Sequence, residues 1–576
     1  MINRRVFLRR IGLGAMSTVA ASLGFEKNFA RGQESKDSPN VILVMTDDQG
    51  YGDFSCHGHP ILKTPNIDAL HDQSVRLIDF HVDPSCSPTR AALLTGRYAA
   101  RAGVWDTSSG RQILRSDEVT MADVFRKNGY RTAIFGKWHL GHNYPYLPEN
   151  RGFDEALVHY AGGVGRPPDY PGNDYFDDTY FRNGKPEKFK GYCTDVWFRE
   201  AMRFIANNRK RPFFLYIPTN APHTPYIVDE KYSKPFLKKG VSQTRARYYG
   251  MCTNIDENVG LLRKHLRDFG LEKNTIFIFL TDNGGTGGLK LSKKYHGFVT
   301  SGYNAGMRGA KQSMYEGGHR VPCFINWPGE EIGNRPGRDV EQLTAHFDLF
   351  PTLIDLCNLN GTENIRFDGT SLVPLLRQKP VKWPERKLVV AVNRNENPER
   401  WHRTAILTER WRLINGQELY DIQADPEQRR DIAANHPNLV TELRQFYDEY
   451  WKDISKRFGE YSRLVIGAPQ ANPTILCSHS LLEYTHQIAV KVVRSGEYEI
   501  SLVQSRPPEK EPLGSLDARV KISNVDLRKK VEPGATAAVF TTRLAAGDAF
   551  LKTWLTDNNN GKKDDAKFII FRYLRP

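Results

Sequence analysis

The chain has 576 residues, of which 26% are charged, and its formal net charge is +15. This length exceeds the size at which a single hydrophobic core stops growing, so we expect one large domain with smaller additions. The mean hydropathy is -0.54 and the sequence lacks an uninterrupted apolar stretch of membrane-spanning length, which argues against an integral membrane protein.

The first 30 residues are typical of an export signal. Arg4 and Arg5 precede a modest apolar run from Ile11 to Phe25 that is rich in Gly, Ala and Ser. This pattern resembles a twin-arginine signal, which carries bacterial proteins out already folded. A membrane anchor or an amphipathic helix is the alternative, but the run is too short and too rich in small residues to span a bilayer easily. We therefore predict a signal peptide at residues 1–30, the twin-arginine export machinery as a partner, no stable membrane anchor, and a periplasmic or extracellular location.

The positive charge narrows the partners only partly. A basic exported protein could favour polyanions such as sulfated polysaccharides. Nucleic acid is the rival polyanion, but the sequence has no aromatic-basic stacking motif, zinc-finger spacing or recognition-helix pattern, and we predict no nucleic-acid partner. A solvated basic surface explains the charge equally well. The seven cysteines are too sparse for a disulfide scaffold, and the sequence leaves their pairing open.

From about Asn40 to Leu356, apolar strand-like runs alternate with amphipathic helical patterns, which is typical of parallel βαβ units. The runs are continuously apolar, as expected for strands that are buried on both faces. The four clearest strands are expected at 40–45, 132–135, 212–217 and 275–280. We predict an α/β catalytic domain at residues 40–380, with a large, mostly parallel sheet flanked by helices.

Two smaller regions follow. Residues 381–460 are predicted to form a small α+β subdomain, with strands at 388–392, 404–407 and 411–414 and a helix between 438 and 456. Residues 471–576 alternate apolar and polar positions, most clearly at 496–503 and 567–573, and are predicted to form a β-rich C-terminal domain.

Two strands that are far apart in the chain are followed by nearly the same short motif. The first is followed by TDDQG at 46–50 and the last by TDNGG at 281–285. Because the carboxyl ends of parallel strands share one edge of the sheet, the side chains of these two motifs should lie close together there. Asp47, Asp48, Asp282 and Asn283 would form an all-oxygen set suited to Ca²⁺ or Mg²⁺. Either motif alone could simply cap a helix or form a turn, but the presence of both favours a metal site.

Other strand ends add basic residues. Lys137 and His139 come just after one strand, and His223 lies beyond another. A lone histidine is usually structural and a lone lysine is usually solvated. Both interpretations weaken when these residues lie on the edge that already holds the candidate metal ligands.

The stretch CSPTRAALLTGRY, from Cys86 to Tyr98, begins with a cysteine followed by a helix-capable run. Pro88 is well placed to start a helix, and Gly96 to end it. Cys86 would then lie at a helix N-terminus, where free N–H groups and the helix dipole lower a thiol's pKa. Arg90 would lie over the same face. A buried cysteine entering a helix is the alternative.

CSPTR followed by LTGR resembles the signature of the sulfatase family, whose cysteine is converted to Cα-formylglycine. The resemblance extends from Asn40 to about Lys456. It includes TDDQGYGD at 46–53, GKWHLG at 136–141, APHTP at 221–225, TDNGG at 281–285 and GAKQSMYEGGHRVP at 309–322.

The resemblance implies an alkaline phosphatase-like fold, a sulfated small-molecule or carbohydrate substrate, and a formylglycine-generating enzyme as partner. It implies that Ca²⁺, with Mg²⁺ the less favoured ion, is held by Asp47, Asp48, Asp282, Asn283 and modified Cys86. It also implies that the sulfate is surrounded by Arg90, Lys137, His139, His223 and Lys311. A hydrated aldehyde from Cys86 would be the nucleophile of a sulfuric ester hydrolase. In this scheme Asp282 and His139 act as bases, and His223 or Lys311 protonates the leaving alcohol.

Two other functions remain open. A related hydrolase of the same superfamily would act on phosphodiesters or phosphonates. A catalytically inactive glycan-binding protein would use the C-terminal β-rich region instead, although the intact set of site residues argues against it.

Overall fold

The computed structural model describes residues 38–292, 297–379, 382–507, 510–514, 516–558 and 560–576. The predicted signal peptide at 1–30 lies outside these ranges. Among the described residues, no helix combines the length and the apolar character needed to cross a bilayer. All seven cysteines are described, and each is an unpaired thiol.

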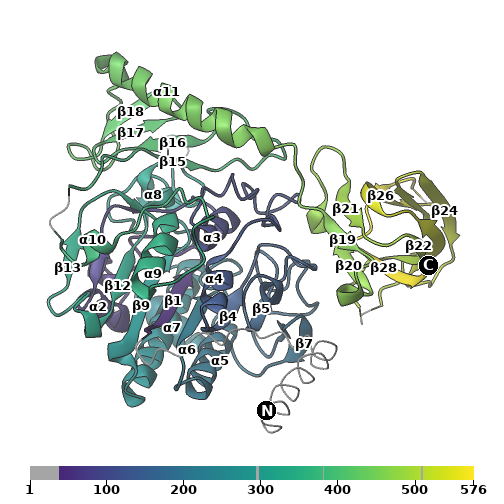
Figure 1. Cartoon of the computed structure of the whole chain (residues 1–576), viewed down its shortest axis with the longest axis horizontal. Helices are drawn as coiled ribbons and strands as arrows, with labels where there is room; N and C mark the ends of the chain where they lie inside the picture. Colours follow the sequence, from purple (N-terminus) through teal and green to yellow (C-terminus); the bar gives the residue numbers. More distant parts are fainter. Residues whose placement is uncertain (1–37, 293–296, 380–381, 508–509, 515, 559) are drawn as a thin grey trace, which may run out of the picture. The chain divides into compact units, whose positions relative to one another are not determined.

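A ten-stranded sheet forms the centre of the large domain (Figure 1), in the order β13-β2-β12-β9-β1-β8-β4-β5-β6-β7. Its five central strands are parallel: β9 (Thr275–Thr281), β1 (Asn40–Thr46), β8 (Phe213–Pro218), β4 (Arg131–Lys137) and β5 (Glu155–His159). The flanking strands are β13 (Arg338–Val340), β2 (Val75–Leu77), β12 (Cys323–Asn326), β6 (Thr179–Arg182) and β7 (Lys185–Lys188). The mostly parallel α/β sheet predicted from the sequence is confirmed, but β12 and β6 run antiparallel to their central neighbours, β9 and β5.

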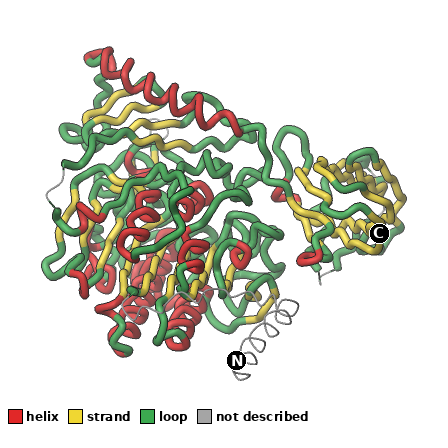
Figure 2. The backbone as a smooth tube through the Cα atoms, viewed as in Figure 1, coloured by secondary structure: helices red, strands yellow, loops and turns green. Residues whose placement is uncertain are grey.

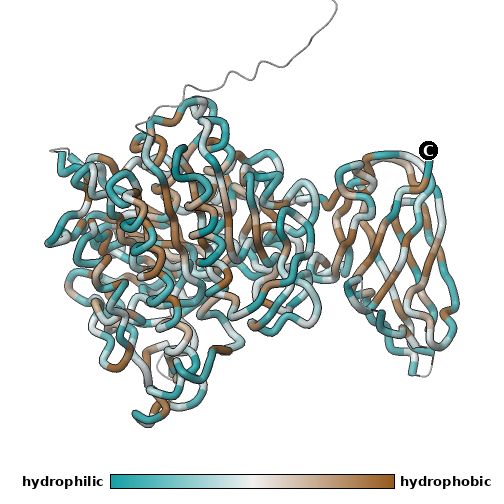
Figure 3. The backbone as a smooth tube through the Cα atoms, turned by 90° about the horizontal axis from the view of Figure 1, so that it is seen from below, coloured by the Kyte–Doolittle hydropathy of each residue, from teal (hydrophilic) through white to brown (hydrophobic). Residues whose placement is uncertain are grey.

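The central strands are apolar throughout because both of their faces are covered. On β1, Val41 and Leu43 belong to one hydrophobic cluster, while Ile42 and Val44 belong to another. Successive side chains of a strand point to opposite faces, so the two clusters lie on the two sides of the sheet. Figure 3 shows hydrophobic residues concentrated along these strands.

Helices cover both faces of the sheet (Figure 2). The cluster containing Ile42 includes side chains from α2 (Pro65–His71), α5 (Cys193–Asn207) and α7 (Gln243–Asp268). The cluster containing Val41 includes side chains from α3 (Cys86–Thr95), α4 (Met121–Lys127) and α9 (Leu349–Cys357). The other strands and α-helices described in this region are β3 (Phe80–His81), α6 (Glu230–Leu237), β10 (Lys290–Leu291), β11 (Val299–Ser301), α8 (Glu316–His319), β14 (Thr344–Ala345) and α10 (Val373–Leu376).

A four-stranded antiparallel sheet follows, in the order β15-β16-β17-β18. Its strands are β15 (Leu388–Ala391), β16 (Thr404–Leu407), β17 (Trp411–Ile414) and β18 (Glu418–Asp421), and helix α11 (Pro437–Ile454) packs on it. Ile406 and Leu413 of the sheet share a core with Leu443 and Tyr447 of the helix.

Arg412, on β17, ties this sheet to the large domain. Its guanidinium is fully buried and donates hydrogen bonds to Glu316 Oε1 at 2.7 Å and to Asp79 Oδ1 at 2.9 Å. Burial by itself would raise the pKa values of Glu316 and Asp79. Both pKa values nevertheless lie below their usual range because the Arg412 guanidinium faces the two carboxylates.

We expect Arg412→Met to lower the free energy of unfolding by about 3–5 kcal/mol at pH 7, because two buried carboxylates lose their counter-charge. Carboxylates with lowered folded-state pKa values stabilise the fold above their unfolded pKa, about 4, and this contribution is lost as the pH falls through the folded values. Denaturant titrations should therefore show that the difference in free energy of unfolding between the variant and the parent protein becomes smaller below about pH 4. Arg410→Met is the matched control, since Arg410 pairs with Asp421 at the surface. Equal losses from both substitutions would contradict this account.

The C-terminal region is a sandwich of two sheets, which confirms its predicted β-rich character. One sheet has the order β19-β21-β26-β23-β24 with β27 paired to β26, and the other has the order β20-β28-β22-β25. The strands are β19 (Leu464–Ile466), β20 (Thr474–Cys477), β21 (Ile488–Val492), β22 (Gly496–Val503), β23 (Leu516–Ile522), β24 (Val525–Val531), β25 (Ala538–Leu544), β26 (Gly547–Asp557), β27 (Lys563–Asp564) and β28 (Phe568–Arg575). Alternate residues such as Tyr498 and Ile500 fill the core between the sheets, and Ile113 and Tyr146 of the large domain join that core.

Candidate active site

The two loops with similar sequences meet at the carboxyl edge of the sheet. β1 and β9 pair in parallel with Thr46 opposite Thr281, so their loops start side by side. The Asp48 N–H donates to Asp282 Oδ1 at 3.0 Å, and Asn283 Nδ2 donates to Asp48 Oδ1 at 2.9 Å. These residues and Asp47 are buried. The structure thus brings the four predicted oxygen-bearing residues together.

Three cationic side chains face these carboxylates. Lys137 Nζ lies 2.5 Å from Asp47 Oδ2, and Lys311 Nζ lies 2.5 Å from Asp48 Oδ1. Arg90 Nη2 lies 3.0 Å from Asp282 Oδ2. Arg90 comes from α3, while Lys137 ends β4 and Lys311 lies in a loop before α8, so distant parts of the sequence build this cluster.

The cluster fits a hard divalent cation. Asp47 Oδ1 and Asn283 Oδ1 are buried and have no hydrogen-bond partner among the described residues. Potential ligand atoms of Asp47, Asp48, Cys86 and His223 lie within 4.8 Å of one another. Carboxylate and amide oxygens are the ligands that Ca²⁺ and Mg²⁺ prefer. Since three carboxylates already balance three cations, a bound divalent ion would leave the site net positive, as an anionic substrate requires.

Cys86 lies in the first turn of α3, beside this cluster. The helix spans Cys86–Thr95 and ends at Gly96, whose φ of 66° is left-handed, so the predicted helix with its glycine stop is confirmed. Lys311 Nζ lies 3.3 Å from Cys86 Sγ. The expected lowering of the thiol pKa is wrong: burial, helped by Asp47 and Asp282, raises the pKa of Cys86 to about 11. The thiol stays protonated at neutral pH and is not itself an activated nucleophile.

The two predicted histidines differ in environment. His139 Nε2 lies 3.0 Å from the Thr107 carbonyl oxygen, and its Nδ1 is buried and unpartnered among the described residues. Burial and Lys137 hold the pKa of His139 well below its usual range, so the ring is neutral and can accept a proton. His223 donates through Nδ1 to the Thr224 carbonyl at 2.7 Å, which leaves its Nε2 3.7 Å from Asp48 Oδ2. Burial lowers the pKa of His223 as well.

These side chains open onto a pocket of about 490 Å³. Its lining includes Cys86, His139, His223 and Lys311, which the sequence predicted, whereas Arg90, Lys137 and the four oxygen-bearing residues lie outside the lining. Residues that sequence reasoning missed also line it: Thr107, Ser108, Gly162, Arg166, Pro167, Gln312, Arg394, Ser478 and His479. Gln312 lies within the GAKQSMYEGGHRVP motif at 309–322, whereas the others come from segments in which the sequence shows no such motif.

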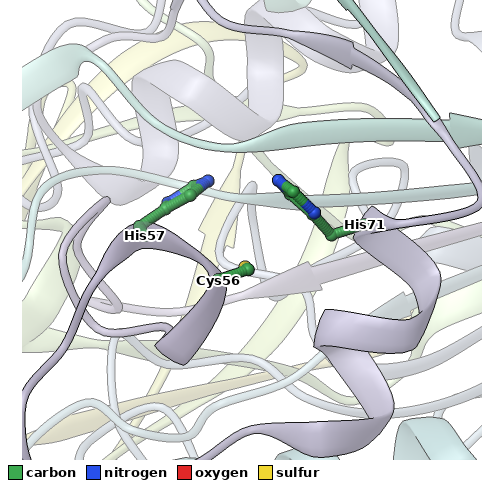
Figure 4. A group of neighbouring side chains, drawn as sticks. All are labelled: Cys56, His57 and His71. Atoms are coloured by element: carbon green, nitrogen blue, oxygen red, sulfur yellow. The ribbon is translucent and has the colours of Figure 1, made fainter. Parts of the chain in front are cut away.

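A second group of ligand-type side chains lies elsewhere in the large domain (Figure 4). Potential ligand atoms of Cys56, His57 and His71 lie within 4.8 Å of one another, and the two imidazole rings approach each other through ring nitrogens. Burial and nearby Asp68 raise the pKa of Cys56, so its thiol stays protonated. None of the three residues lines the pocket, and the chemistry proposed below does not use them.

The sheet topology and the cluster at its carboxyl edge define an alkaline phosphatase-like α/β protein. A family model described as "Sulfatase" matches residues 39–359, and the chain therefore belongs to the sulfatase family. A second model, "N-sulphoglucosamine sulphohydrolase, C-terminal", matches residues 309–452.

Among curated proteins, human arylsulfatase A is 30% identical over 475 residues, with 76% of this chain and 85% of that protein covered. Human N-acetylgalactosamine-6-sulfatase is 33% identical over 364 residues, covering 59% of this chain. The chain spans 66% of the length of that relative, slightly less than two thirds.

Among solved structures, Ps i-CgsB in complex with k-i-k-neocarrahexaose matches with a TM-score of 0.64 and 28% identity. The match covers 74% of this chain and 95% of that one. Phosphonate monoester hydrolase of Agrobacterium radiobacter shares the fold, with a TM-score of 0.51, 22% identity, and 73% and 96% of the two chains covered.

Proposed function

We propose that the protein is a sulfuric ester hydrolase that cleaves sulfate monoesters of sulfated carbohydrates. The observation that carries this proposal is the position of Cys86. It begins a buried helix, contacts Lys311, and lines the same pocket as His139 and His223. Membership of the sulfatase family supports the same reaction.

Two groups implied by the family fit these residues. Asp47, Asp48, Asp282, Asn283 and residue 86 would hold Ca²⁺, whose charge would stabilise the sulfate in the transition state. Cys86, oxidised to Cα-formylglycine by a formylglycine-generating enzyme, would supply a hydrated aldehyde as the nucleophile. The protonated thiol of Cys86 agrees with its role as a precursor.

The chain's own side chains would stabilise charge and move protons. Arg90, Lys137 and Lys311 offset the negative charge that a nucleophile meets on approaching a sulfate ester. Asp282, whose carboxylate accepts from the Asp48 N–H and faces Arg90, would serve as the base for the attacking hydroxyl. The neutral ring of His139 is a second base, since its Nδ1 has no partner among the described residues.

The leaving alcohol would take its proton from His223 or Lys311. Both line the pocket. If His223 is the acid, His223→Ala should reduce kcat about 10²- to 10⁴-fold on alkyl and sugar sulfates, and far less on activated aryl sulfates, whose leaving groups need no proton. Equal losses on both classes would assign the proton to another group, and Lys311→Ala tested on the same substrates provides the comparison.

The relatives and the charge of the chain favour a carbohydrate substrate. The relatives include an N-acetylgalactosamine-6-sulfatase and a protein solved with a neocarrahexaose. The net charge of +15 suits a polyanionic polysaccharide. Export through the twin-arginine machinery to the periplasm or beyond would bring the enzyme to such a substrate.

The test is a substrate panel on full-length protein produced with a formylglycine-generating enzyme. Sulfated mono- and oligosaccharides of known linkage are compared with phosphodiesters and phosphonate esters. We expect a sulfate monoester to be cleaved with the highest kcat/KM, by about 100-fold or more. A preference for a phosphonate or phosphodiester would overturn the proposal, and so would glycan binding without turnover of any ester.

A further inference from the structure

The pocket has a second set of basic side chains that sulfate cleavage does not use. Arg166, Arg394 and His479 line it together with Cys86 and Lys311. Each comes from a different region: a loop after β5, the loop after β15, and the C-terminal sandwich.

The two arginines present their charge to solvent at the pocket. Arg166 is exposed and forms no ion pair with any residue that the structure describes. Its loop is fixed by Asp169, whose N–H donates to the Arg166 carbonyl at 2.7 Å and whose carboxylate accepts from Gly165 at 2.9 Å. Arg394 is also exposed, and among the described residues its guanidinium makes a long contact of 3.5 Å to Asp106 and a hydrogen bond to Thr107 Oγ1 at 3.3 Å. Both guanidinium groups therefore keep donors available for a ligand.

His479 is held at the pocket by contacts between the C-terminal sandwich and the large domain. It lies in a short 3₁₀ turn, Ser478–Ser480, directly after β20. Next to this turn, Cys477 Sγ lies 3.6 Å from His142 Nε2, and the Ile475 carbonyl accepts a hydrogen bond from Asn143 Nδ2 at 2.5 Å.

The His479 ring has a polar atom without a hydrogen-bond partner among the described residues, and the ring lies close to His139. Its centroid lies 6.4 Å from that of His139, and its Nε2 is buried with no hydrogen-bond partner among the described residues. A buried polar atom without a partner costs free energy that a ligand can recover.

We propose that Arg166, Arg394 and His479 form a second anion subsite. Resting on the proposed sulfatase function, it takes an additional carboxylate or sulfate on the sugar that carries the scissile group, or on its neighbour. Guanidinium groups bind carboxylates and sulfates through paired, charge-assisted hydrogen bonds, and the unpartnered Nε2 of His479 offers a further hydrogen-bonding atom. His479 makes the C-terminal sandwich part of the substrate site and a determinant of specificity.

The experiment compares three substrates with the same scissile sulfate on full-length, formylglycine-containing enzyme. One sugar carries no other anion, one adds a uronate carboxylate, and one adds a second sulfate. The variants are Arg166→Gln, Arg394→Gln and His479→Ala. His486→Ala is the matched control, since His486 lies on the same sandwich, pairs with Asp565 and does not line this pocket.

We expect each subsite variant to lower kcat/KM, mainly through KM, about 10-fold more on a two-anion substrate than on the one-anion sugar. The two-anion substrate on which kcat/KM falls further identifies the second anion as carboxylate or sulfate. Equal losses on all three substrates, or the same selectivity in the His486→Ala control, would overturn the subsite. Failure of the parent enzyme on every sulfate ester would instead refute the proposed function, so the two results are distinguishable.

Discussion

Replacing Cys86 with alanine is expected to reduce sulfate release by about 10⁴-fold or more, because in the proposed mechanism the substitution removes the side chain from which the nucleophile is made. The fold should be retained, since alanine is small and is a good helix former at the start of α3. The measurement is kcat on the preferred sulfate ester, together with the thermal midpoint of unfolding.

Cys323→Ala is the matched control for this substitution. Cys323 is also buried, but it lies on β12, outside the pocket. We expect it to lower stability through the small cavity that it leaves and to keep the folded enzyme active. If Cys86→Ala retained activity comparable to that of the control, residue 86 would not supply the nucleophile.

Removing the divalent ion will produce the second large effect. A calcium chelator should lower turnover by about 10²-fold or more, because the ion's charge is needed when the sulfate is attacked. In the proposed site the ion would bind only the folded state, so added Ca²⁺ should also raise the free energy of unfolding, by about 2.7 kcal/mol at 100 times its Kd. Thermal unfolding measured with and without Ca²⁺ checks this independently of activity.

Asp48→Asn should weaken both responses, since Asp48 lies within the oxygen cluster and faces Lys311. Glu187→Gln, an exposed change on β7, should leave both unchanged. A chelator-treated protein that keeps full activity and shows no stabilisation by Ca²⁺ would show that the oxygen cluster does not bind this ion.

The sequence predicted the central sheet well because buried parallel strands have a strong local pattern. Runs such as 40–45 and 275–280 are apolar throughout, and the structure places strands at Asn40–Thr46 and Thr275–Thr281. The short outer strands were not predicted. β2 has only three residues and β7 is fully exposed, so neither shows the apolar pattern that identifies a strand.

The candidate site was partly predictable for a related reason. Asp47 and Asp282 directly follow strands that pair in register, so topology alone brings them together. Arg166 and His479 reach the same pocket from loops far apart in the chain, and only the packing of the C-terminal sandwich shows that they meet.

The pKa of Cys86 shows where local reasoning fails. The helix N-terminus suggested a lowered value, but complete burial and the carboxylates of Asp47 and Asp282 raise it. Those carboxylates come from the loops after β1 and β9, so their effect on Cys86 cannot be inferred from the helix sequence.

The most direct test of the account measures conversion and activity together. Batches of protein made with different amounts of a formylglycine-generating enzyme are analysed by mass spectrometry of the peptide that contains Cys86, where conversion replaces one sulfur and two hydrogens with one oxygen. The account predicts that the specific activity of sulfate release rises in proportion to the converted fraction and falls to zero when none is converted. Sulfate release that does not depend on this fraction, or full activity with an intact Cys86 thiol, would contradict it.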